Sequence, residues 1–235
     1  MNTVRIVLLA ILFSISLPSQ GENAQPLATN QDKVNAQLLD DGTKLLMAKK
    51  PKEAIEYFEK IAADYEKRFK NDNDKIFCAR SPAESLLYLL ESANNKKNAK
   101  VVSSNWAYAY FMKAYALIEL GKLNESKSNL ERALALSPWN SQFLSELGHV
   151  YQLEKNWPLA LQTYQRAEEA AKAASPPESK NAELSRAWRG LGYVYVELSQ
   201  LDEAEKMYRQ CLELDKNDQR ALNELRYIQD LRAKK

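Results

Sequence analysis

Few residues in this chain are of types that could do chemistry. His149 is the only histidine among 235 residues, and Cys78 and Cys211 are the only cysteines. A metal site built on histidines, or a Ser-His-Asp arrangement, needs more such groups than the chain has. Neither a glycine-rich phosphate loop nor a CxxC pair is present. The sequence therefore predicts no catalytic residue, no metal site and no cofactor, and His149 is expected to pack or to form a hydrogen bond.

The two cysteines leave two possibilities open. In an oxidising compartment Cys78 and Cys211 could form a disulfide. Alternatively, Cys211 is a small buried residue near the end of a helix, and Cys78 is a free thiol in a loop.

Large residues, glycines and alanines recur at fixed spacing. Residues 144–151 read Leu-Ser-Glu-Leu-Gly-His-Val-Tyr and residues 188–195 read Trp-Arg-Gly-Leu-Gly-Tyr-Val-Tyr. This spacing places the bulky groups on one side of a helix. Glycine costs about 1 kcal/mol relative to alanine inside a helix, so it indicates that a neighbouring helix crosses closely. The residues expected to make this packing are Gly42, Ala54, Leu147, Gly148, Tyr151, Ala160, Trp188, Leu191, Gly192, Tyr195 and Ala204.

This pattern resembles the tetratricopeptide repeat, a 34-residue pair of antiparallel helices with the signature W-x2-L-G-x2-Y…A-x3-F…P. The resemblance is strongest over residues 107–218 and implies an all-α, right-handed superhelical solenoid of helix-turn-helix repeats. The chain departs from the pattern at Ser126, where the family has alanine, and at Lys216, where it usually has proline. Gly148 and Gly192 are 44 residues apart, which indicates an insertion of ten residues between two repeats.

The pattern divides the chain into segments. A last helix that covers the end of the stack is expected, because each repeat buries its apolar face only against a neighbour. The expected segments are a secretory signal peptide at 1–24, a flexible segment at 25–32, a degenerate repeat at 33–68, an irregular helical insertion at 69–106, repeats at 107–140, 141–184 (with the ten-residue insertion) and 185–218, and a capping helix at 219–235.

The N-terminal segment has the features of a secretory signal. Arg5 precedes an apolar run of twelve residues from Ile6 to Leu17, and Pro18 and Gly21 follow. Twelve residues are too few to cross a bilayer core, which needs roughly 20. We therefore expect an exported protein, periplasmic or secreted, with no stable membrane insertion after signal cleavage. An uncleaved membrane anchor is the alternative.

The resemblance also indicates where a partner could bind. In such solenoids the first helix of each pair lines a concave face, and its residues that point away from the core are available to a partner. Aromatic contact area and arginines there would suit an extended or helical peptide. The groove positions are Tyr108, Phe111, Tyr115, Gln142, Ser145, His149, Arg186, Arg189, Tyr193, Arg220, Asn223 and Tyr227.

A structural alternative exists for these groove positions. The rings could instead pack on neighbouring first helices, and the arginines could be solvated or paired with Glu183 and Glu224. Members of the family that clamp a peptide's terminal carboxylate use lysine and asparagine where this chain has Phe111 and Tyr115. The sequence therefore does not support that class of partner.

The charge composition argues against one class of partner. With 33 basic and 31 acidic side chains the net charge is +2, which disfavours nucleic acid as a partner. We expect a non-catalytic scaffold that binds a protein or peptide in assembly or maintenance of a cell-envelope complex. The alternative is a glycan- or cell-wall-binding module that stacks sugars on Tyr115, Tyr193 and Tyr227. An enzyme with appended repeats is disfavoured, because no segment outside the repeats is long enough for a catalytic domain.

Overall fold

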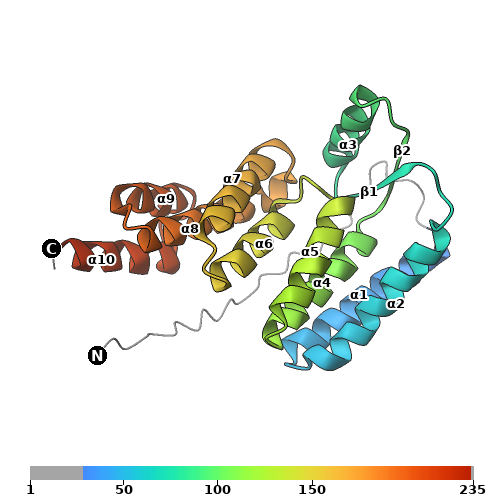
Figure 1. The fold of residues 1–235 in the computed structure, drawn as a ribbon, viewed down its shortest axis with the longest axis horizontal. Coiled ribbons are helices and arrows are strands. Elements are labelled where there is room, and N and C mark those ends of the chain that lie inside the picture. The colour runs from blue at the N-terminus through green and yellow to red at the C-terminus, as the bar shows by residue number, and fades with distance from the viewer. Residues whose placement is uncertain (1–28, 234–235) are drawn as a thin grey trace.

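The computed structural model describes residues 29–233, so the predicted signal peptide lies outside the described residues. Figure 1 shows an elongated stack of helices, with α1 and α2 at one end and α10 at the other. In chain order the described elements are α1 (Asn30–Met47), α2 (Pro51–Arg68), β1 (Lys75–Ala79), α3 (Pro82–Asn94), β2 (Ala99–Ser103), α4 (Asn105–Glu119), α5 (Leu123–Leu136), α6 (Ser141–Leu153), α7 (Trp157–Ala173), α8 (Pro177–Glu197), α9 (Leu201–Leu214) and α10 (Gln219–Ala233).

The helices form an all-α solenoid of hairpins. Helices α1 and α2, α4 and α5, α6 and α7, and α8 and α9 each pack as a pair, and α10 packs on α9 at the end of the stack. Helix α2 packs on α4, so the first pair continues into the next across the intervening strands. Among residues 29–233, no helix is both long and apolar enough to cross a membrane.

Residue size is matched inside the helix pairs. In three pairs, a Cβ added to the glycine of the first helix would lie between 2.6 and 3.0 Å from an aromatic ring of the second helix. The close neighbour is thus a ring rather than a helix backbone. In the pair α4–α5 the corresponding residues are Ala114 and Leu130, both fully buried. The glycine–aromatic pairs are Gly42–Phe58, Gly148–Tyr164 and Gly192–Tyr208.

The other expected packing residues lie in or beside the same core. The alanines of the second helices have no exposed surface, and Leu147, Trp188 and Leu191 are buried. Tyr151 and Tyr195 are half-buried and pack against the core from its edge. These positions therefore hold successive pairs together. The three alanines are Ala54, Ala160 and Ala204.

The segment before α4 differs from the expected irregular helical insertion. Strands β1 and β2 pair in parallel, with Lys75 opposite Ala99 and Ala79 opposite Ser103, and only α3 between them is helical. Phe77 of β1 stacks on Tyr88 of α3, with ring centroids 5.0 Å apart. The sequence did not reveal the strands because both faces of β1 are covered, which removes the alternation of apolar and polar residues that identifies a half-buried strand.

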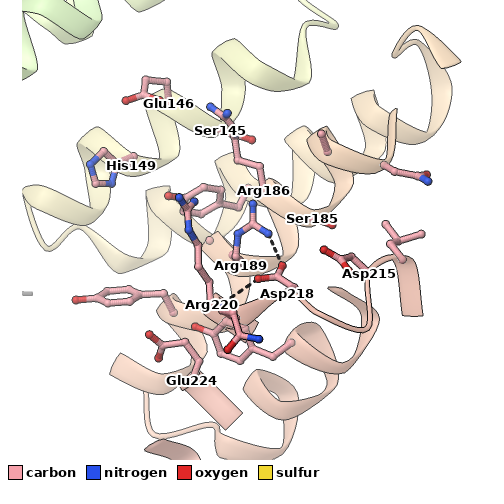
Figure 2. A pocket seen from close by; sticks show the side chains of 18 of the residues that line it. Ser145, Glu146, His149, Ser185, Arg186, Arg189, Asp215, Asp218, Arg220 and Glu224 are labelled. Carbon is pink, nitrogen blue, oxygen red and sulfur yellow. Dashed lines mark hydrogen bonds and ion pairs between the residues drawn. The ribbon is translucent and has the colours of Figure 1, made fainter. Parts of the chain in front are cut away.

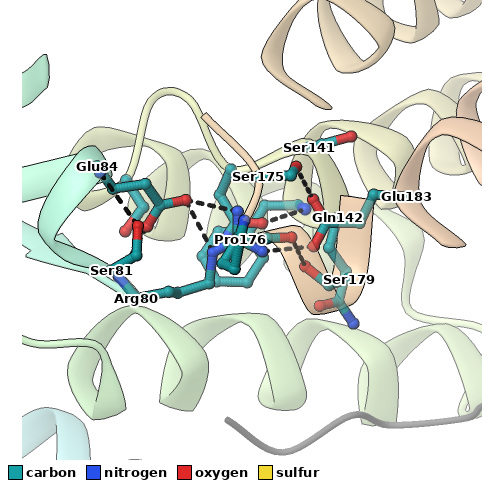
Figure 3. A network of polar contacts seen from close by, with 12 residues as sticks. Arg80, Ser81, Glu84, Ser141, Gln142, Ser175, Pro176, Ser179 and Glu183 are labelled. Atoms are coloured by element: carbon teal, nitrogen blue, oxygen red, sulfur yellow. Dashed lines mark hydrogen bonds and ion pairs between the residues drawn. The ribbon is translucent and has the colours of Figure 1, made fainter. Parts of the chain in front are cut away.

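A buried ion cluster joins this segment to the ten-residue insertion. Glu84 accepts hydrogen bonds from the backbone N–H of Arg80 at 2.7 Å and from its Nε at 2.8 Å, and Arg80 Nη1 donates to Glu183 Oε1 at 2.6 Å. The three side chains are 5%, 0% and 7% exposed for Arg80, Glu84 and Glu183. Ser175 donates to the other oxygen of Glu183 (Figure 3). The two departures from the repeat period thus contact each other.

The insertion between repeats lengthens helices rather than a loop. Helix α8 starts at Pro177, after the N-cap residue Pro176, and runs for 21 residues. The extra turns at the start of α8 carry Glu183, and its side chain accepts the hydrogen bond from Arg80. The two prolines therefore end α7 and begin α8.

The N-terminal end of the described chain also differs from the expectation of a flexible segment up to residue 32. Thr29 caps α1 in a capping box with Asp32. Asp32 also accepts hydrogen bonds from Tyr65 and Arg68 of α2, each at 2.8 Å. Burial acts to raise the pKa of Asp32, but the hydrogen bonds from Arg68, Thr29 and Tyr65 outweigh it and lower this pKa to about 2.

Replacing Asp32 with asparagine is expected to destabilise the protein near neutral pH by about 2 kcal/mol. The ordinary pKa of 3.8 is the unfolded value, so the stabilisation is complete above it and is lost as the pH falls through about 2. Urea unfolding of both proteins, from about pH 7 to about pH 3, should therefore show a deficit that shrinks below about pH 4. Asp230→Asn, at an exposed position of α10, is the control. A deficit independent of pH would contradict the assignment.

The two cysteines do not form a disulfide. Cys78 and Cys211 are both free and have no exposed surface. Cys78 lies in β1, not in a loop, and packs in the core of the first pairs, whereas Cys211 lies in the core of the last repeat. Burial raises the pKa of each thiol to about 12, so both are unreactive at neutral pH.

Candidate functional site

A pocket of about 570 Å³ opens between the first helices α6 and α8 and the capping helix α10. Its floor includes Tyr164 and Tyr208, the rings that pack against the repeat glycines. A volume in this range is typical of ligand sites. Figure 2 shows side chains from all three helices directed toward it. The charged and polar lining residues include Ser145, Glu146, His149, Gln152, Ser185, Arg186, Arg189, Asp215, Asp218, Arg220 and Glu224.

Asp218 fixes one wall of the pocket. Its Oδ1 accepts hydrogen bonds from the backbone N–H groups of Arg220 and Ala221, at 3.0 and 3.1 Å, and so caps the start of α10. Its Oδ2 pairs with Nη1 of Arg189 at 2.6 Å. One carboxylate therefore holds the capping helix against α8.

The arginines make this wall electropositive. Burial lowers the pKa of Arg186, and the nearby charges of Arg189 and Arg220 act in the same direction, while Glu146 acts against them. The guanidinium of Arg220 makes no ion pair with any residue of the described range. A carboxylate on a ligand could therefore bind here with a charge-assisted hydrogen bond.

The pocket brings together half of the predicted groove positions. All of them come from the last two repeats and the cap, and none from α4. The sequence left open an ion pair of Arg189 with Glu183 or with Glu224, and neither forms. Arg189 pairs with Asp218 instead, and Glu183 pairs with Arg80. The shared positions are Ser145, His149, Arg186, Arg189, Tyr193 and Arg220.

Two of the predicted groove residues, Tyr108 and Phe111, are buried and cannot contact a partner. Tyr108 is 8% exposed and Phe111 is 1% exposed. Phe111 stacks on Phe143 of α6 with centroids 4.8 Å apart, and Tyr108 meets the same ring edge-on at 5.2 Å. Burial raises the pKa of Tyr108, whose ring lies beside Arg80 of the β1–α3 segment. Phe143 and the β1–α3 segment therefore close this end of the groove.

The other four predicted positions do not line the pocket. Gln142 accepts a hydrogen bond from the Tyr108 hydroxyl at 3.4 Å. Tyr115 is half-buried against the N-terminal core, and burial raises its pKa to about 12. Asn223 accepts from Arg226 at 2.6 Å, and Tyr227 is 50% exposed on α10. Of the four tyrosines predicted for the groove, only Tyr193 lines the pocket.

Three residues that shape the site are not marked by the repeat pattern. Glu146 and Asp218 occur at positions that the repeat leaves variable, so nothing in the pattern marked them. Gly190 lies against the Tyr164 ring, where an added Cβ would be 2.2 Å from Cε1. Its signal was available, because a second glycine two residues before Gly192 faces a different side of the helix.

Metal ligation has no candidate in this part of the chain. Within residues 29–233, no three histidine, cysteine, aspartate or glutamate side chains are grouped to hold an ion.

These features define a solenoid of helical hairpin repeats with a pocket on the face formed by its first helices. Residues 107–138 and residues 141–217 each match a family model described as tetratricopeptide repeat. Residues 107–138 and 141–217 of the chain are therefore tetratricopeptide repeats. No curated protein matches the sequence.

Two solved structures, of PilF and MamA, share the fold. PilF from Pseudomonas aeruginosa is 14% identical, with a TM-score of 0.61, and the match covers 88% of this chain and 72% of that one. MamA (41-end) from Desulfovibrio magneticus RS-1 is 17% identical, with a TM-score of 0.55 and 88% of each chain covered. The first repeat domain of Spaghetti (RPAP3), bound to the HSP90 peptide SRMEEVD, is 25% identical with a TM-score of 0.48, over 56% of this chain and 97% of that one.

Proposed function

We propose that this chain is an exported, non-catalytic scaffold that binds a segment of a partner protein in the pocket between α6, α8 and α10, in assembly or maintenance of a cell-envelope complex. The observation that carries the proposal is the pocket itself. It combines the aromatic surface of Tyr193 with the guanidinium of Arg220, and both types of side chain are enriched where proteins bind one another. The apolar run in residues 6–17 supports export.

The position of the pocket favours binding of a short segment of a partner protein over binding of a broad, flat surface of that protein. It lies between helices from two repeats and the cap, so a ligand there contacts α6, α8 and α10 at once. A volume of about 570 Å³ accommodates only a few residues, which matches a short stretch of a larger partner.

Site-specific photo-crosslinking tests the proposal. A photoreactive phenylalanine analogue at Tyr193 of the tagged full chain, irradiated in the producing cells, is expected to yield a discrete protein adduct, because this side chain lines the pocket. The mass of the recovered chain reports whether the N-terminal segment has been removed. Adding Arg220→Ala should reduce the adduct.

The control places the same analogue at Arg166, an exposed position of α7 that does not line the pocket. Equal adducts from both positions, or none from Tyr193, would count against binding in the pocket. Loss of the adduct on adding soluble cell-wall polysaccharide would instead favour the glycan-binding alternative.

A further inference from the structure

The α6 wall of the pocket carries buried hydrogen-bond acceptors that nothing in the described chain satisfies. Glu146 is 3% exposed and Ser145 is 2% exposed, and both line the pocket. Glu146 Oε1 and Ser145 Oγ have no hydrogen-bond partner. Buried polar atoms are nearly always paired, and an unpaired one is costly, so these two atoms need an explanation.

The opposite wall of the pocket carries hydrogen-bond donors instead of acceptors. Arg189 and Arg220 lie on α8 and α10, and Arg220 has no ion pair within the described range. Arg186 attracts Glu146, yet no hydrogen bond from the described residues reaches Glu146 Oε1. Figure 2 places Glu146 and Ser145 on the helix on one side, with Arg186 and Arg220 between it and α10. The pocket is therefore polarised, with acceptors on α6 and donors facing them.

We infer that the pocket selects a segment that carries a basic side chain close to an acidic one. The lysine or arginine of this segment donates hydrogen bonds to Glu146 Oε1 and Ser145 Oγ, and the acidic residue accepts from Arg220. This inference rests on the proposed function and adds the charge pattern of the ligand. Hydrogen bonds between charged groups are shorter and stronger than neutral ones, and a wrong charge on either wall would be repelled.

A purely acidic ligand fits the geometry less well. It would satisfy the arginine wall but would leave Glu146 Oε1 buried without a donor, and it would place a like charge beside it. The acceptors on α6 therefore distinguish this pocket from a simple anion site.

Selection from a phage-displayed library of random peptides tests the inference, with the full chain as bait. Peptides enriched on this protein are expected to pair an acidic residue with a lysine or arginine a few positions away. Glu146→Gln keeps the shape of the side chain and should remove the preference for the basic residue, and it should weaken a selected peptide about tenfold in fluorescence anisotropy. Arg220→Gln should instead remove the preference for the acidic residue.

Glu169→Gln and Arg166→Gln, at exposed positions of α7, are the matched controls and should leave both preferences intact. Circular dichroism of Glu146→Gln checks that the fold persists, and Ser145→Ala gives a second, smaller change on the same wall. Enriched peptides without a basic residue, or a basic preference that survives Glu146→Gln, would overturn the inference while leaving the proposed function standing. Failure to enrich any peptide, together with no adduct at Tyr193, would overturn both.

Discussion

Replacing Arg80 with methionine is expected to lower the free energy of unfolding by about 3–5 kcal/mol. Arg80 is the only cation within hydrogen-bond distance of both Glu84 and Glu183 among the described residues, and all three side chains are almost completely buried. Without it, Glu84 remains in the interior with no counter-charge, and Glu183 retains only the charge of Arg186. Burial already raises the pKa of Glu84, which shows how poorly its charge is solvated there. Urea unfolding near neutral pH measures the effect.

Because the cluster of Arg80, Glu84 and Glu183 joins two segments, its loss should also be visible as local opening of those segments. Arg80 and Glu84 belong to the β1–α3 segment, whereas Glu183 belongs to the first turns of α8. Loss of Arg80 should therefore release the contact between these two segments before the whole protein unfolds. Amide hydrogen exchange is expected to rise first in α3 and in the first turns of α8, with less change in α2 and α9.

A matched control separates burial from charge. Arg209→Met removes an exposed ion pair with Glu205 and should cost only about 0–1 kcal/mol. Replacing all three cluster residues with apolar side chains of similar size should restore much of the stability, because no buried carboxylate is then left unpaired. An Arg80→Met protein that is no less stable than Arg209→Met would show that the cluster does not hold the segments together.

The cluster also shows what a periodic pattern can and cannot predict. The repeat signature predicted the family and the all-α solenoid, because each signature position reports a local contact within a helix pair. The segments that break the period carried no such information. That Arg80 meets Glu183, 103 positions away, depends on how two irregular segments fold over the repeats.

The same limit explains the mixed result for the groove. Extrapolating the period named Arg186, Arg189 and Tyr193, which lie in regular repeats and line the pocket. It failed at Tyr108 and Phe111, because the neighbouring β1–α3 segment and Phe143 cover them. Glu146 was missed because a variable position of the repeat has no preferred residue type. The burial of Glu146 and the lack of a hydrogen-bond partner for its Oε1 depend on the folded structure, so the sequence does not reveal them.

Gly190→Ala is expected to destabilise the protein by about 2–3 kcal/mol, although alanine is the better helix former by about 1 kcal/mol. The added Cβ would lie 2.2 Å from Tyr164 Cε1 and 2.4 Å from Cζ. The ring cannot move away, because Gly148 packs against it and its hydroxyl donates to Gln152 at 3.1 Å. Thermal and urea unfolding should both report the loss. Gly148→Ala, whose Cβ would lie 3.0 Å from the same ring, should cost less.

A smaller side chain in place of the ring should relieve this clash. The residue of α5 that corresponds to Tyr164 is Leu130, which is fully buried. Tyr164→Leu should therefore be destabilising alone but should offset most of the cost of Gly190→Ala, since the new methyl group occupies the space that the ring vacates. A double-mutant cycle measures this coupling, which should favour the double variant by about 1–2 kcal/mol. Additive costs would mean that Gly190 is required for its backbone and not for the ring beside it.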